Sequence, residues 1–306
     1  MTSLAHFEKV AGALALPGKA VIDGQQLAAV SGTTFDNVSP RDGRVLNQVA
    51  ACNGADIDIA VASARAAFDD GRWRKLSYRD KKRILFKLAD IMERETENLA
   101  VLESLDVGKP IANALNGDVP QAIRTLRYYA EALDKIYGEV GPETQDRFSF
   151  VVHEPLGVIG AIVPWNFPLH MAMWKVAPAL AMGNSVVLKP AEQSPLTALK
   201  LGELALEAGL PPGVLNVVPG MGGTAGKALA LHNDVDMIAF TGSGAVGRLL
   251  MKYSGESNLK RVSLELGGKS PHIVFADCPD LDKAAEHAAW GIFYNQGQVC
   301  TAASRL

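Results

Sequence analysis

The stretch Phe240-Thr241-Gly242-Ser243-Gly244-Ala245-Val246-Gly247 decides the fold that we expect. It places Gly-x-Gly-x-x-Gly between an apolar run over residues 235–240 and a helical run over residues 248–253. A strand, a glycine turn and a helix in this order are typical of a dinucleotide-binding unit, in which glycines let the backbone approach a pyrophosphate at the helix N-terminus. The alternative is a tight strand-to-helix turn that binds no ligand. The turn alone leaves both interpretations open.

Three further apolar runs repeat the same pattern of strand and helix. Residues 158–163, 185–188 and 215–218 each predict a buried strand that a helical segment follows. Repeated units of this kind predict an α/β fold with a Rossmann-like parallel sheet that helices cover. In such sheets ligands bind beyond the carboxyl ends of the strands. The loops after these strands and after residue 240 are therefore expected to line one site.

The first half of the chain predicts a hairpin, several helices and an arm. Ala20-Val21-Ile22 before Asp23-Gly24 predicts a hairpin. A further strand is expected over residues 45–49, and helices are expected over residues 56–68, with Asp56 as the cap, from Ser77 onward, and over residues 120–137. Residues 148–153 and a second segment around Gly141 predict a strand pair that forms an arm.

Composition and charge argue against several classes of protein. The chain has 306 residues and a formal net charge of -3, so nothing predicts an electrostatic footprint for nucleic acid. The long apolar stretch 156–188 is interrupted by Pro164, Pro168 and Pro178, which argues against a membrane span. An odd number of cysteines and an N-terminus without a cleavage-like segment predict a cytoplasmic protein without a disulfide framework.

Two glutamates compete for one role, which is to contact a ribose hydroxyl of a bound nucleotide. Glu265 lies at about the usual distance after the glycine turn. Glu192 follows the strand over residues 185–188, beside Lys189, and could face the same hydroxyls. The alternative is that Glu192 is an ordinary solvated loop residue that binds no ligand. Spacing alone does not choose between the two acids.

Three residues are candidates for catalysis. Cys300 follows the polar segment Asn295-Gln296-Gly297-Gln298, a setting that suits a reactive thiol, although free cysteines are often buried and structural. Glu265 lies between two leucines and could act as a base if an apolar cleft raises its pKa, or it is simply an exposed strand residue. Asn166, in Pro164-Trp165-Asn166-Phe167-Pro168, could donate to a developing oxyanion, or it belongs to a plain turn.

Five linked motifs resemble those of the NAD(P)-dependent aldehyde dehydrogenase superfamily. They are PWNFP at residues 164–168, LKPAEQSP at 188–195, FTGSGAVG at 240–247, LELGGKSP at 264–271 and FYNQGQVC at 293–300. The resemblance covers nearly the whole chain. Within the superfamily the chain is most similar to the polyamine-catabolic γ-glutamyl-γ-aminobutyraldehyde dehydrogenases.

The resemblance implies a role for each candidate residue. It makes Cys300 the nucleophile, Glu265 the general base and Asn166 the oxyanion donor. It assigns cofactor binding to Trp165, Lys189, Glu192, Gly222, Gly242, Ser243 and Gly247. It assigns the substrate tunnel to Phe167, Met171 and Trp174, although Met171 and Trp174 have a spacing that is more often that of core residues. No metal ion is expected among these groups.

The implied reaction is the oxidation of an aldehyde to a carboxylic acid. The Cys300 thiolate would attack the aldehyde, and loss of hydride to the nicotinamide of NAD or NADP would leave a thioester. Glu265 would then activate water to release the acid. Glu192 should repel a 2′-phosphate, which favours NAD over NADP. A CoA-acylating reaction is a further alternative, against which the presence of Glu265 argues.

The resemblance also implies a division into domains. Residues 1–137 and 156–266 would form the NAD-binding domain, residues 138–155 an oligomerisation arm, and residues 267–306 the start of a catalytic domain. Family members continue well beyond the nucleophile, so we expect a truncated chain with little or no activity by itself, and a homo-oligomer for the complete protein. The competing hypothesis is a catalytically silent nucleotide-binding or scaffold fragment of that family.

Overall fold

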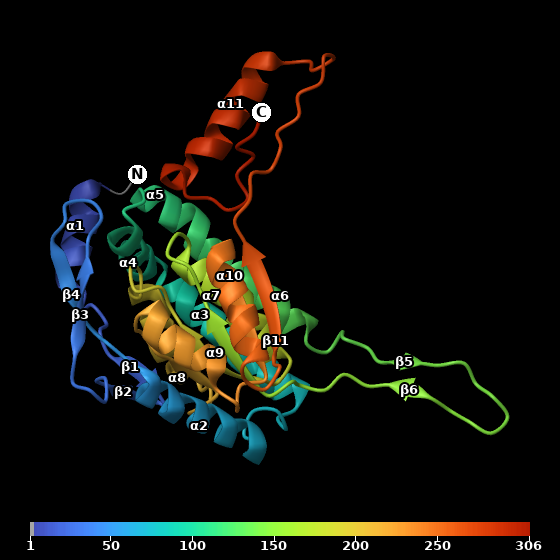
Figure 1. Ribbon diagram of the computed structural model, residues 1–306. Coiled ribbons are helices and arrows are strands. Elements are labelled where there is room, and N and C mark those ends of the chain that lie inside the picture. Colours follow the sequence, from blue (N-terminus) through green and yellow to red (C-terminus); the bar gives the residue numbers. More distant parts are fainter. Residues whose placement is uncertain (1–2) are drawn as a thin grey trace.

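A seven-stranded sheet forms the centre of the computed structural model, which describes residues 3–306 (Figure 1). Its strand order is β11-β10-β7-β8-β9-β1-β2. The parallel strands are β7 (Val158–Ile162), β8 (Ser185–Lys189), β9 (Leu215–Val217), β10 (Met237–Gly242) and β11 (Arg261–Leu266). The short strands β1 (Ala20–Ile22) and β2 (Gln25–Leu27) add an antiparallel hairpin at one edge. The predicted parallel sheet and the predicted hairpin are therefore confirmed.

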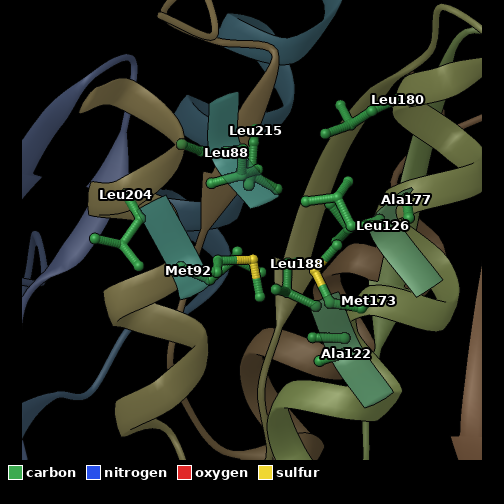
Figure 2. Packing of buried hydrophobic residues seen from close by; sticks show 14 of the residues in the cluster. Leu88, Met92, Ala122, Leu126, Met173, Ala177, Leu180, Leu188, Leu204 and Leu215 are labelled. Atoms are coloured by element: carbon green, nitrogen blue, oxygen red, sulfur yellow. The ribbon is translucent and has the colours of Figure 1, made fainter. Parts of the chain in front are cut away.

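Helices cover both faces of the sheet because alternate side chains of a strand point to opposite faces. One cluster of buried side chains involves α3 (Tyr78–Arg94), α6 (Val119–Ala132), α7 (Pro168–Ala181) and α8 (Leu196–Ala208). The opposite cluster involves α2 (Gly54–Asp70), α9 (Lys227–Leu231) and α10 (Gly244–Gly255). Figure 2 shows the first cluster, with Leu188 of β8, Met173 of α7 and Leu126 of α6. Burial of each such side chain stabilises the fold by about 1.5–3 kcal/mol.

Helix ends follow their capping residues, with two differences from the prediction. Ser77 caps α3 as expected. Asp56 is not the cap of α2, because Asn53 takes that place and the Asp56 carboxylate accepts from the Asn53 N–H at 2.8 Å to complete a capping box. The helix predicted to end at Tyr137 ends at Ala132, because Tyr137 is exposed and has no core to cover.

Several further elements complete the region around the sheet. The strand predicted over residues 45–49 is β4 (Val45–Ala50), which pairs with β3 (Thr34–Val38). The remaining helices and π-helical turns of this region are α1 (Leu4–Ala13), α4 (Thr96–Val107), α5 (Ile111–Asn113), η1 (Ala114–Asp118) and η2 (Gly222–Gly226). Within residues 3–306, no helix has both the length and the apolar character of a membrane span.

Two segments stand away from the sheet and its helices (Figure 1). The first is a hairpin of β5 (Glu139–Val140) and β6 (Phe150–Val151), which projects outward where the arm was predicted. The second begins after β11 and contains α11 (Leu281–Phe293), which stands away, and the 3-10 turn η3 (Tyr294–Gly297), which returns to contact the turn after β7. The division into domains at these segments stays a prediction.

Glu103 of α4 is a fully buried acid next to the start of α7. One of its oxygens accepts from the Leu169 N–H at 3.4 Å and from the Thr197 hydroxyl at 3.1 Å. Burial raises the pKa of Glu103 to about 7, although the Lys109 ammonium, 3.8 Å from the other oxygen, opposes the shift. Because the usual pKa is 4.5, the folded protein binds more protons than the unfolded chain between these two values.

We predict that Glu103→Gln changes how stability depends on pH. Between about pH 4.5 and about pH 7, Glu103 keeps its proton in the folded state but loses it in the unfolded chain. The wild type therefore loses stability as the pH rises through this range. This loss is at most about 1.4 kcal/mol per pH unit. The free energy of unfolding of the variant, relative to that of the wild type, should therefore rise across this range. Urea unfolding at several pH values measures the difference, and parallel curves would contradict the prediction.

Candidate active site

The turn after β7 carries the predicted oxyanion donor. This turn, residues 164–167, leads from β7 to α7 at the carboxyl end of the parallel strands. Asn166 Nδ2 donates to the Gln298 carbonyl at 2.8 Å, which joins the turn to the segment that contains the predicted nucleophile. An amide nitrogen has two hydrogens, so one N–H remains for another acceptor. Trp165 is 41% exposed, and its carbonyl accepts from Ser194 Oγ at 3.1 Å.

Cys300 ends a segment with an uncommon backbone, residues 294–300, which we call the nucleophile loop. Asn295 and Gln296 have φ angles of 48° and 56°, in the left-handed region that residues with a side chain rarely adopt. Asn295 Nδ2 donates to the Asn166 carbonyl at 3.0 Å. The Cys300 thiol is half-buried and free. The structure therefore brings Asn166 and the nucleophile loop together.

Glu265 lies on β11, a strand at one edge of the sheet. Side chains alternate along β11, so Leu264 and Leu266 pack against the core while Glu265 is exposed. Glu265 therefore has the exposed strand position that was one of its two interpretations. Within residues 3–306, no hydrogen bond or ion pair joins Glu265 to Cys300.

A groove beside Glu265 contains a lysine that the sequence analysis did not assign to the site. Glu265 lines this groove, of about 370 Å³, together with Trp174 and Lys175 of α7. Lys175 Nζ donates to the Thr241 hydroxyl of β10. Burial lowers the pKa of Lys175 to about 8, and the Glu265 charge opposes the shift. The one sequence signal of Lys175 is that it is the sole formally charged residue in the apolar stretch 156–188.

The glycine turn between β10 and α10 leads into a capped helix N-terminus. Ser243 is the N-cap of α10, and its hydroxyl accepts an N–H of the first turn at 3.3 Å. A Cβ atom on Gly242 would collide with the Phe240 ring, and one on Gly247 would lie 3.1 Å from Leu266 Cδ2. Both glycines therefore lie close against neighbouring side chains, which would have to shift to admit a larger residue. The first turn of α10 has no acidic residue, so its N–H groups suit an anion.

Glu192 forms an ion pair with Lys189, the last residue of β8. Lys189 Nζ lies 3.1 Å from Glu192 Oε2. Burial lowers the pKa of Lys189, against the opposing charge of Glu192. Burial also acts to raise the pKa of Glu192. The Lys189 charge and hydrogen bonds, one of them from the Gly222 N–H, outweigh burial and hold this pKa below its usual value. The charged carboxylate suits ribose hydroxyls as donors.

The predicted substrate residues lie on successive turns at the start of α7. Phe167 stacks on Tyr294 of the nucleophile loop, with 6.3 Å between the ring centroids. Trp174 is 44% exposed and lines the groove that contains Glu265. Met171 is buried between these two positions. The structure therefore places Phe167 beside the nucleophile loop and Trp174 beside the predicted base, and it places Met171 in the core.

Comparison with known proteins identifies relatives over nearly the whole chain. Residues 27–306 match the model of the aldehyde dehydrogenase family. The NADP/NAD-dependent aldehyde dehydrogenase PuuC of Escherichia coli is 54% identical over 303 residues, which are 99% of this chain and 61% of that protein. The aminoacetaldehyde dehydrogenase of Pseudomonas aeruginosa is 51% identical over 306 residues, which are 100% of this chain and 62% of that protein.

Solved structures agree with the fold. A crystal structure of indole-3-acetaldehyde dehydrogenase with NAD+ matches at 55% identity and a TM-score of 0.98. The γ-glutamyl-γ-aminobutyraldehyde dehydrogenase of Burkholderia cenocepacia matches at 56% identity and a TM-score of 0.98. Each match covers 100% of this chain and 62% of the other, so the chain spans about three fifths of the length of these relatives. On the family model, these identities and the shared fold, the chain belongs to the aldehyde dehydrogenase family.

Proposed function

We propose that this chain takes part in the NAD(P)-dependent oxidation of an aldehyde to a carboxylic acid, as the part that binds the cofactor and carries the nucleophile. One observation carries the proposal: Asn166 Nδ2 lies 2.8 Å from the carbonyl of Gln298, a residue that closely precedes Cys300. An N–H donor and a thiol thus share the carboxyl end of a parallel sheet, where ligands bind in this fold. A covalent thiol mechanism needs this pair of groups.

The loops at this end of the sheet fit a dinucleotide, which we propose to be NAD, with NADP as the second choice. Ser243 and the first N–H groups of α10 would hold the pyrophosphate. Glu192 would accept from the ribose hydroxyls, with Lys189 beside it. Further cofactor contacts are proposed for Trp165, Gly222, Gly242 and Gly247. When bound, NAD supplies the acceptor for the hydride that leaves the aldehyde carbon.

Cys300 and Asn166 would carry out the first half of the reaction. The Cys300 thiolate would form a C–S bond to the aldehyde carbon, and an electron pair would move onto the aldehyde oxygen. The free N–H of Asn166 Nδ2 and the backbone N–H of Cys300 would donate to this oxyanion. When the C=O bond forms again, the hydride leaves the carbon and a thioester on Cys300 remains.

Glu265 would carry out the second half. Its carboxylate would take a proton from a water molecule, whose oxygen attacks the thioester carbon. The C–S bond then breaks, which releases the carboxylic acid and regenerates the Cys300 thiolate. The exposed position of Glu265 on β11 supports this role, because water reaches the carboxylate directly.

An aminoaldehyde is the substrate that we propose. Relatives named for aminoacetaldehyde and for γ-glutamyl-γ-aminobutyraldehyde are 51% and 56% identical to the chain. The exposed Trp174 offers an aromatic face, which attracts ammonium groups. Phe167, whose ring already contacts Lys109 and Tyr294, and Met171 would contribute apolar walls. The substrate amine would therefore bind on the side of Trp174.

The β5–β6 arm supports the proposal of a homo-oligomer for the complete protein. Its strands have only two residues each, and it exposes Phe148, Phe150 and Val151. So short a hairpin is not stable by itself, and its unpaired edges can pair with a second copy. The net charge of -3 gives no reason to propose nucleic acid as a partner.

Replacing Cys300 tests the proposed nucleophile. We expect Cys300→Ala to lower aldehyde-dependent NADH formation by about a thousandfold or more, because the step that forms the C–S bond is lost. Cys278→Ala is the matched control and should keep wild-type activity. The assay uses aminoacetaldehyde and the longest form of the protein. Full activity in Cys300→Ala would contradict the mechanism, and no turnover in any form would favour a catalytically silent nucleotide-binding protein.

Replacing Glu192 tests the proposed ribose contact. We expect Glu192→Gln to raise the ratio of NADP to NAD affinity by about tenfold, because the carboxylate no longer repels a 2′-phosphate. The matched control is Glu203→Gln, which breaks the pair of Glu203 with Lys200, 3.0 Å apart with the same three-residue spacing. Binding of both cofactors by calorimetry measures the ratio. An unchanged ratio in Glu192→Gln would place the ribose elsewhere.

A further inference from the structure

Lys109 is a buried cation beside the site that no step of the proposed reaction uses. Its side chain is 1% exposed, and its Nζ donates to the Asp118 carboxylate and, at 3.0 Å, to the Asn166 carbonyl. A Glu103 oxygen lies 3.8 Å away. Burying an ammonium ion is costly even when it is paired, and apolar side chains often serve stability as well or better. Stability alone is therefore a weak explanation for this lysine.

Lys109 contacts the turn that carries the oxyanion donor at two points. The Asn166 carbonyl accepts from both Lys109 Nζ and Asn295 Nδ2, each at 3.0 Å. Lys109 Nζ also lies 4.3 Å from the centroid of the Phe167 ring, in a cation–π contact. Phe167 in turn stacks on Tyr294. Two routes thus lead from Lys109 to the nucleophile loop, one through a backbone carbonyl and one through an aromatic ring.

The nucleophile loop must be held by contacts outside itself. Asn295, Gln296 and Gly297 have φ angles of 48°, 56° and 75°, and side chains at the first two disfavour that backbone. Gln296 Nε2 donates to the carbonyl of Gly108, the neighbour of Lys109, at 2.9 Å. The loop is therefore anchored to the segment that contains Lys109 and to the turn that Lys109 contacts.

We propose that Lys109 is a positioning residue for the reaction: its ammonium fixes the Asn166 carbonyl and thereby holds the Asn166 amide and the nucleophile loop in place. The Asp118 carboxylate accepts from the ammonium and orients it. The Asn166 side chain, held in this way, donates to the Gln298 carbonyl of the nucleophile loop. In this role Lys109 would act through Asn166 and would itself contact neither the aldehyde nor the thiol. The positional part of this inference is that Lys109 holds the nucleophile loop in place, and it is independent of the proposed function. The catalytic part is that this constraint speeds the reaction, and it rests on the proposed function.

Hydrogen–deuterium exchange of this chain, read by mass spectrometry, tests the positional part. Lys109→Met removes the donor at nearly the same length, and Lys109→Met/Asp118→Asn also removes the carboxylate that would be left without its cation. We expect amide exchange in the nucleophile loop to rise by about tenfold or more in both variants. Peptides from β8 should change by less than about twofold.

Lys81→Met is the matched control for removing a buried lysine. Lys81 is 5% exposed, and its Nζ donates to the Arg74 carbonyl at 2.9 Å. Exchange in the nucleophile loop of this variant should equal that of the wild type. Unchanged exchange in the loop of the double variant would overturn the proposal. An equal rise in β8 would overturn it too, because Lys109 would then act only on global stability.

Steady-state kinetics test the catalytic part in the form of the protein that turns over an aminoaldehyde. The double variant should lower kcat by about thirtyfold or more while KM changes by less than about threefold, because Lys109 holds catalytic groups and touches no substrate. Wild-type turnover with an unchanged kcat in the variant would overturn the catalytic role. No wild-type turnover would contradict the proposed function instead, and the exchange result would still decide the positional part.

Discussion

The Asn166 side chain donates to the Gln298 carbonyl at 2.8 Å, while the Asn166 carbonyl accepts from Lys109 and from Asn295 at 3.0 Å. One residue thus connects the turn after β7, the segment after α4 and the nucleophile loop, which lie far apart in the sequence. None of these segments can shift without breaking a bond to the others. The position of the Asn166 amide relative to Cys300 depends on this connection.

The parallel sheet explains why the remaining groups gather at the same end. The strands β7, β8 and β10 all end there, next to the turn that carries Asn166, the Lys189–Glu192 pair and the glycine turn. Glu192 and Glu265, the two candidates for the ribose contact, also have different surroundings. Glu192 pairs with a buried lysine, while Glu265 lines an exposed groove beside Lys175. This difference supports Glu192 as the ribose ligand and Glu265 as the base.

The sequence predicts the features of this fold that depend on local pattern. Buried parallel strands appear as apolar runs, and the helix start at Ser77 follows a local hydrogen bond. Asp56 was misplaced as a cap because Asn53 and Asp56 both suit a helix start, and the capping box uses both.

Features that depend on distant contacts are not predictable in this way. Lys109 follows Gly108 in what resembles a plain turn, and its burial depends on Asp118 and Asn166. The left-handed backbone at Asn295 likewise depends on a bond to Asn166. Periodicity and turn residues carry no information about such pairs. The candidate site was therefore predictable as a set of residues, but not as a connected structure.

The proposed function requires that Cys300 becomes acylated during oxidation of an aldehyde. The most direct measurement is peptide mass spectrometry after the protein has been incubated with aminoacetaldehyde and NAD and quenched with acid. Glu265→Gln is the best variant for it, because loss of the proposed base should slow hydrolysis of the thioester. We predict an acyl group on the Cys300 peptide only when both aldehyde and NAD are present. Acylation without NAD, acylation at Cys278, or no adduct in any form of the protein would contradict it.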